Sequence, residues 1–150
     1  EDANADKQQQ IHDWWKQEDV GVALLAETNK HWSSIPETHR WRERLRRATI
    51  QGFSGMAAWN TTQERAPGES SHQFGGCLAA TLNKTSHYTT STGKDTSGLG
   101  RWAWVRLKGK QKDAGQRNRF EQQQWQHSQD LVVIAAYRPN FPGTGSSTVW

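Results

Sequence analysis

The sequence is poor in cysteine and in long apolar runs. Cys77 is the single cysteine among 150 residues, so the chain can form neither an internal disulfide nor a cysteine-based zinc site. A reducing compartment, the cytoplasm or the nucleus, is therefore the simpler expectation. No run of about 18 apolar residues occurs, which argues against a membrane-spanning helix. The first ten residues are polar and lack the apolar centre of a signal peptide, and because the chain begins with Glu1 we expect a processed or excerpted segment.

The apolar content is also low for a globular domain. Hydrophobic residues make up 33% of the sequence, although nine tryptophans partly compensate because each can bury a large apolar surface. We therefore expect a domain that is rich in loops and lacks part of its core. The net charge of +4 suits an anionic partner such as nucleic acid, but charge alone assigns no function.

The first half of the chain predicts two helices and a buried strand. Residues 1–10 read as a disordered lead-in, after which Ile11, Trp14 and Trp15 share one face of a helix that ends near Glu18. Residues 20–26 are continuously apolar, which predicts a strand buried on both faces, as in a central sheet of an α/β sandwich. A second helix should begin near residues 36–38 and end near residue 47.

The second half predicts several strands separated by polar segments. Alternation places Trp102, Trp104 and Arg106 on one face of their strand. Residues 54–74 read as a loop, residues 84–98 as a short strand plus a loop, residues 108–130 as an exposed loop or insertion, and residues 143–150 as a flexible tail. The expected strands cover residues 48–53, 77–82, 102–107 and 131–137. Together the helices and strands predict an α/β fold.

Four segments, taken in order, resemble the endonuclease/exonuclease/phosphatase superfamily, which includes apurinic-site and retroelement endonucleases. They are Ala26-Glu27-Thr28-Asn29, Gly75-Gly76-Cys77-Leu78-Ala79, Gly98-Leu99-Gly100-Arg101-Trp102 and Tyr137-Arg138-Pro139-Asn140. The resemblance implies a partial four-layer α/β sandwich over residues 11–142, in which two packed mixed β-sheets carry outer helices. It also implies that the N-terminal and C-terminal parts of the domain are missing.

The resemblance implies a metal-dependent phosphodiester site. Glu27 would bind Mg²⁺ or Mn²⁺, which accept carboxylate oxygens together with water and substrate phosphate. Tyr137 and Asn140 would be the catalytic residues beside the scissile phosphate, where a phenol and an amide can donate hydrogen bonds. Asn29 and Arg138 would contact the substrate, since an amide and a guanidinium both suit phosphate oxygens.

Each of these residues has a plainer interpretation. Glu27 could simply end a strand at the surface, Tyr137 could pack at a strand end, and Asn140 could close a turn after Pro139. Arg138 could be a solvated loop residue. The five arginines between residues 40 and 47 could neutralise phosphates, but an amphipathic helix with a solvated basic face explains their spacing better.

The sequence therefore predicts a fragment of a divalent-metal-dependent phosphodiesterase, with nucleic acid, DNA in particular, as substrate and a retroelement as a possible source. The family segments with an early Asn, an Asp-x-Asn pair and a closing Asp-His pair have no counterpart here. We therefore expect the isolated chain to be inactive and to need the rest of its parent polypeptide. The alternatives are an inactive nucleic-acid-binding or protein-binding module of the same fold, and a remnant without activity.

Overall fold

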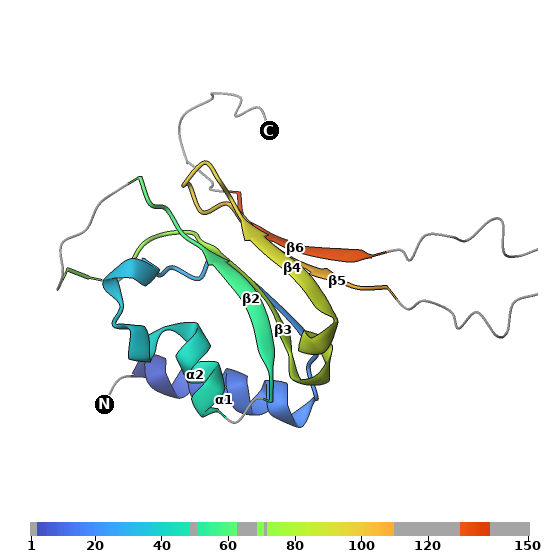
Figure 1. Ribbon diagram of the computed structural model, residues 1–150. Coiled ribbons are helices and arrows are strands. Elements are labelled where there is room, and N and C mark those ends of the chain that lie inside the picture. Colours follow the sequence, from blue (N-terminus) through green and yellow to red (C-terminus); the bar gives the residue numbers. More distant parts are fainter. Residues whose placement is uncertain (1–2, 49–50, 63–68, 71, 110–129, 139–150) are drawn as a thin grey trace, which may run out of the picture.

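The computed structural model describes residues 3–48, 51–62, 69–70, 72–109 and 130–138. The described chain contains two α-helices, three short 3₁₀ segments and six strands (Figure 1). The helical elements are α1 (Ala3–Gln17), η1 (Trp32–Ser34), η2 (Glu37–His39), α2 (Trp41–Arg47) and η3 (Asn83–Tyr88). The strands are β1 (Val22–Ala26), β2 (Phe53–Ala58), β3 (Cys77–Leu82), β4 (Thr89–Lys94), β5 (Trp102–Leu107) and β6 (Leu131–Ala136).

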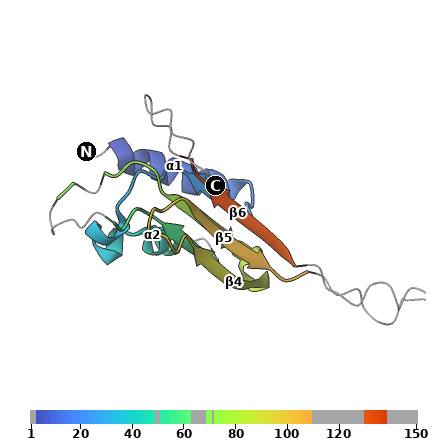
Figure 2. The ribbon, with the colours of Figure 1, turned by 90° about the horizontal axis from the view of Figure 1, so that it is seen from above.

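The strands form two three-stranded sheets, with orders β1-β3-β2 and β4-β5-β6. Viewed from above, β4, β5 and β6 lie side by side in that order (Figure 2). Every pairing among these strands is antiparallel, so the mixed sheets expected from the resemblance are not observed in the described part of the chain. The architecture is mixed α/β, in agreement with the coarser prediction.

The first sheet is packed on both faces. On one face, Trp15 of α1 and Leu45 of α2 pack against apolar residues that include Leu78 and Leu82 of β3. On the other face, Ala79 faces the second sheet, and the buried cluster there consists of Ala58, Cys77, Ala79, Ala103, Val105 and Ala135. Most of these side chains are small, so the two sheets can approach closely. The helices thus cover one side of the first sheet and the second sheet covers the other (Figure 1).

The strand expected to be buried on both faces is a partly exposed edge strand. Strand β1 has one neighbouring strand in the sheet, β3, and its residue Leu24 is 41% exposed. The fully buried central strand is β3, all six residues of which are buried. The prediction that residues 20–26 are buried on both faces was therefore wrong, because a strand at the edge of a sheet leaves part of a continuous apolar run exposed.

Other boundaries also differ from the prediction. Helix α1 begins at Ala3, so residues 3–10, expected to be a disordered lead-in, are helical. Strand β2 occupies Phe53–Ala58, most of which was expected to be loop. Its Gly55 is required by packing, since a Cβ atom there would lie 2.5 Å from the carbonyl oxygen of Ala79. Because Ser54 and Gly55 interrupt β2, its sequence lacks the apolar alternation that indicates a strand.

The alternation in β5 is confirmed, since Ala103, Val105 and Leu107 are buried while Trp102, Trp104 and Arg106 lie on the opposite face. Within the described ranges, no helix has the length and apolar character needed to cross a lipid bilayer. The 143–150 tail and most of the 108–130 segment lie outside the described residues.

Candidate functional site

The candidate site begins where β1 ends. Glu27 and Asn29 both have left-handed backbone angles, with φ of 56° and 50°. The Glu27 side chain is exposed and makes no hydrogen bond or ion pair with another described residue. A left-handed conformation is unfavourable for a residue with a Cβ atom, so two such residues so close together need strong support from their neighbours.

That support comes from Gly75 and Gly76, immediately before β3. The backbone N–H of Asn29 donates to the carbonyl of Gly75 at 2.8 Å, and the N–H of Thr28 donates to the carbonyl of Gly76 at 3.2 Å. In return, the N–H of Gly75 donates to Oδ1 of Asn29 at 3.0 Å. The side chain of Asn29 is thus used to hold the turn, and its amide NH₂ group has no hydrogen-bond partner among the described residues.

Tyr137 reaches the same glycine pair from the second sheet. A Cβ atom on Gly75 would lie only 2.7 Å from Cε1 of Tyr137, so the aromatic ring lies directly against this glycine. The backbone N–H of Tyr137 donates to the carbonyl of Arg101 at 2.7 Å, which continues the β5–β6 ladder by one residue. The structure therefore brings Asn29 and Tyr137, which are far apart in the sequence, to the two sides of Gly75.

Arg101 is held from a third direction by Asp95. The carboxylate of Asp95 accepts hydrogen bonds from the Arg101 N–H at 2.9 Å and from the N–H and hydroxyl of Ser97 at 2.9 and 2.6 Å. Burial alone would raise the pKa of Asp95, but these hydrogen bonds and the charge of Arg101 outweigh it and lower the pKa below its usual value. Asp95 therefore fixes the loop that positions Tyr137.

Cys77 lies under the same loop. Its thiol donates to the carbonyl of Arg101 at 3.3 Å, and its side chain is fully buried. Burial, assisted by the negative charge of Asp95, raises the pKa of this thiol to about 11. The thiol is thus protonated at neutral pH and serves as a packing and hydrogen-bonding group, not as a nucleophile.

Lys94 and Trp59 extend the same end of the sandwich. The ammonium group of Lys94 lies 4.5 Å from the centre of the Trp59 ring, and the backbone of Trp59 packs against Gly100. Neither residue was singled out from the sequence. Asp95 was also missed, although the Asp95-Thr96-Ser97 order is typical of a turn in which a carboxylate accepts a hydrogen bond from the backbone two residues later.

The predicted residues divide into three groups. Glu27, Asn29 and Tyr137 lie at one end of the sandwich, and the structure links Asn29 to Tyr137 through Gly75. Arg138 is exposed and immediately follows Tyr137. Asn140 lies outside the described residues, so its predicted role stays a prediction.

A nearby histidine, His31, is buried at 4% exposure. Its Nδ1 is 3.0 Å from the Ser33 hydroxyl, and its carbonyl accepts a hydrogen bond from Ser34. These contacts within the loop make His31 a structural residue of the turn.

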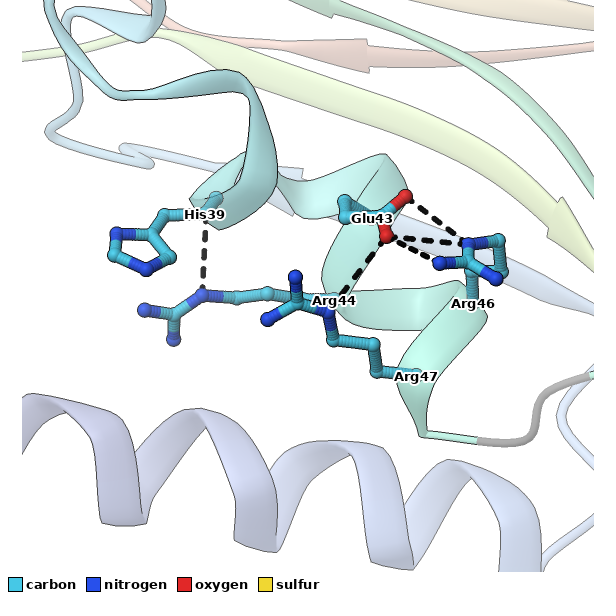
Figure 3. Close-up of polar contacts among 5 residues, drawn as sticks. All are labelled: His39, Glu43, Arg44, Arg46 and Arg47. Atoms are coloured by element: carbon cyan, nitrogen blue, oxygen red, sulfur yellow. Dashed lines mark hydrogen bonds and ion pairs between the residues drawn. The ribbon is translucent and has the colours of Figure 1, made fainter.

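The arginines of the α2 region are engaged within the protein. Arg40 and Arg44 donate to the carbonyls of Ile35 and His39, each at 3.1 Å. Arg46 and Arg47 flank Glu43 (Figure 3), and the hydrogen bond from Arg46 lowers the pKa of this exposed carboxyl. These contacts favour the solvated amphipathic helix over a dedicated phosphate-binding cluster.

The donor set at Glu27 fits a metal that keeps most of its water. Within the described ranges, no group of three or more histidine, cysteine, aspartate or glutamate side chains could hold a metal ion. Mg²⁺ can bind through one or two carboxylates plus water and substrate phosphate, so a single exposed carboxylate suits Mg²⁺ better than Zn²⁺.

Comparison with known proteins identifies no relative of this chain: no family model, no curated protein and no solved structure matches it.

Proposed function

We propose that this chain carries part of the active site of a divalent-metal-dependent phosphodiesterase that cleaves nucleic acid, with DNA as the favoured substrate. The observation that supports the proposal is the junction at Gly75, where the turn that follows Glu27 is hydrogen-bonded on one side and Tyr137 packs on the other. Two segments that resemble the family's metal-binding and phosphate-binding motifs thereby share one end of the sandwich.

The proposed roles follow from the chemistry of each side chain. Glu27 holds Mg²⁺ or Mn²⁺, and the bound ion would polarise a phosphoryl oxygen and stabilise charge on the leaving group. The phenol of Tyr137 donates a hydrogen bond to a phosphate oxygen, and Asn140 assists it. The amide NH₂ of Asn29 is available for the same purpose because its Oδ1 already binds the Gly75 N–H. Arg138 neutralises a neighbouring phosphate.

The same proposal extends to the complete domain. A four-layer sandwich would then contain the helices, the first sheet and the second sheet as three of its layers. The rest of the parent polypeptide would supply the fourth layer, on the outer face of the second sheet, together with the remaining catalytic groups. A reducing intracellular compartment, nuclear or cytoplasmic, suits the single buried thiol. A retroelement reading frame is the proposed source.

Cleavage of DNA by the chain extended through its flanking reading frame tests the enzymatic proposal. Supercoiled plasmid should be nicked in the presence of Mg²⁺, and Glu27→Gln should reduce the rate by at least about 100-fold, since it removes the charge that holds the metal. Glu37→Gln, an exposed change in η2, is the matched control and should retain the wild-type rate. Equal nicking by Glu27→Gln and wild type would refute the metal-ligand role of Glu27.

One observation favours a second candidate, an inactive nucleic-acid-binding module of the same fold. In the described part of the chain, no three or more potential metal ligands are grouped together, at the candidate site or elsewhere. A binding module would retain DNA with an affinity that falls steeply as salt is raised, would show no Mg²⁺-dependent nicking, and would bind equally well after Glu27→Gln.

A further inference from the structure

The structure contains a pocket that the phosphodiesterase proposal does not use. It lies between α1, α2 and the helix-covered face of the first sheet, and its volume is about 200 Å³. The residues that line it are mainly apolar and include three tryptophans, Trp15, Trp32 and Trp41. An engineered apolar cavity of about 150 Å³ is large enough to bind benzene, so this pocket can accept a single aromatic ring.

The titratable side chains that line the pocket are all basic. His12, Lys30 and Arg44 all line it, whereas no acidic side chain among the described residues does. Burial lowers the pKa of His12 most and the positive charge of Arg44 lowers it further, while the negative charge of Asp13, outside the pocket lining, opposes them. The pocket therefore combines an apolar interior with a positive potential, and a negatively charged group would be attracted to it.

Two other polar atoms of lining residues have no hydrogen-bond partner among the described residues. They are the indole N–H of Trp32 and the hydroxyl oxygen of Thr28, and both are buried. Buried donors are rarely left unpaired in a folded protein because each costs about 1–3 kcal/mol. Both atoms are inaccessible to water, so they lie behind the pocket wall, and the polar groups available to a ligand are those of the basic side chains.

We propose that this pocket binds a small aromatic carboxylate. The aromatic ring lies among Trp15, Trp32 and Trp41, and the carboxylate faces Lys30 and Arg44. A ring fits better than a flexible aliphatic chain because three indoles line a space of ring size, and stacked or edge-to-face contacts favour a planar partner. A carboxylate fits better than a neutral polar group because the lining offers cations and no anions. This proposal is independent of the phosphodiesterase proposal.

Titration of the full chain with phenylacetate, followed by tryptophan fluorescence and by chemical shifts, tests the proposal. Phenylacetamide is the matched probe, since it has the same shape without the charge. We expect saturable binding of phenylacetate and at least about tenfold weaker binding of phenylacetamide, the difference typical of a charged hydrogen-bonded contact. Equal affinity for the two compounds would overturn the proposal. So would the absence of saturation by phenylacetate up to about 10 mM, since a Kd above that value corresponds to less than about 3 kcal/mol of binding energy.

Variants locate the bound ligand. Lys30→Gln and Arg44→Gln should each weaken phenylacetate binding about tenfold. Lys84→Gln, an exposed change in η3, removes the same charge at a residue that does not line the pocket and should bind as wild type does. Ile11→Trp should block the pocket, and because Ile11 is 41% exposed the helix should tolerate the larger ring. Undiminished binding by a folded Ile11→Trp protein would contradict the assignment to this pocket. Arg44→Gln also removes the hydrogen bond from Arg44 to the His39 carbonyl and could unfold the protein for that reason. In that case the Lys30 variant alone measures how much a positive charge contributes to ligand binding.

Discussion

The ring of Tyr137 lies against Gly75, so closely that a Cβ atom on this glycine would be 2.7 Å from Tyr137 Cε1. Gly75 also has a φ of 86°, a conformation that L-residues adopt only with strain. Its N–H is bound to the side chain of Asn29. The contacts of Gly75 therefore join the two sheets and three of the four family-like segments, and they can be tested by substitution.

Gly75→Ala should destabilise the protein by at least about 2 kcal/mol, since the left-handed backbone costs 1–2 kcal/mol and the added methyl group meets the tyrosine ring. Urea unfolding measures the loss. Tyr137→Ala removes the ring, so in the double variant the methyl group has room and part of the cost of Gly75→Ala should disappear. Strict additivity of the two substitutions would contradict the contact between Tyr137 and Gly75.

Asp95→Asn should cost about 2 kcal/mol, because the carboxylate accepts three hydrogen bonds and an amide can accept through one oxygen only. The pKa of Asp95 is lowered in the folded protein, so its contribution is present above the ordinary value of 3.8 and is lost as the pH falls through the folded value. The stability difference between wild type and Asp95→Asn should therefore shrink as the solution is acidified below about pH 4. A difference that stays constant down to acid unfolding would show that the carboxylate charge is unimportant.

The thiol of Cys77 should resist alkylation in the folded protein. With a pKa of about 11, it is almost entirely protonated at neutral pH, and it is fully buried. Iodoacetamide should label it rapidly only when urea unfolds the chain. Rapid labelling of the native protein would contradict both the burial and the raised pKa.

The same thiol makes stability depend on pH at the alkaline end. Its folded pKa lies above the ordinary value of 9.0, so its contribution is present below about pH 9 and is lost as the pH rises towards about 11. Wild type should lose stability relative to Cys77→Ala over this range. Parallel pH profiles for the two proteins would contradict the shift.

Sequence patterns predicted those strands in which apolar residues alternate or cluster clearly. β3 and β5 have the predicted bounds, and the separation of Ala103 and Val105 from Trp102 and Trp104 follows directly from a period of two. β2 was missed because the requirement at Gly55 comes from the close approach of β3, a tertiary contact that no local pattern reveals.

The candidate site was predictable only in part. The apolar run of β1 and the polar turn after Glu27 are visible in the sequence, but whether β1 is central or at the edge depends on which strands pair with it. The junction at Gly75 and the support of Arg101 by Asp95 depend on residues that are distant along the chain. The pocket between α1 and α2 likewise depends on how the two helices pack on the sheet.

Binding of a divalent metal at Glu27 is the central claim, and Mn²⁺ titration of the ¹⁵N-labelled chain tests it most directly. Paramagnetic broadening should appear first at the amides of residues 27–29 and 75–76, should extend to Tyr137, and should be competed by Mg²⁺. Glu27→Gln should abolish this localised broadening, while Glu37→Gln leaves it unchanged. Broadening that persists in Glu27→Gln, or that is centred elsewhere on the protein, would contradict the account.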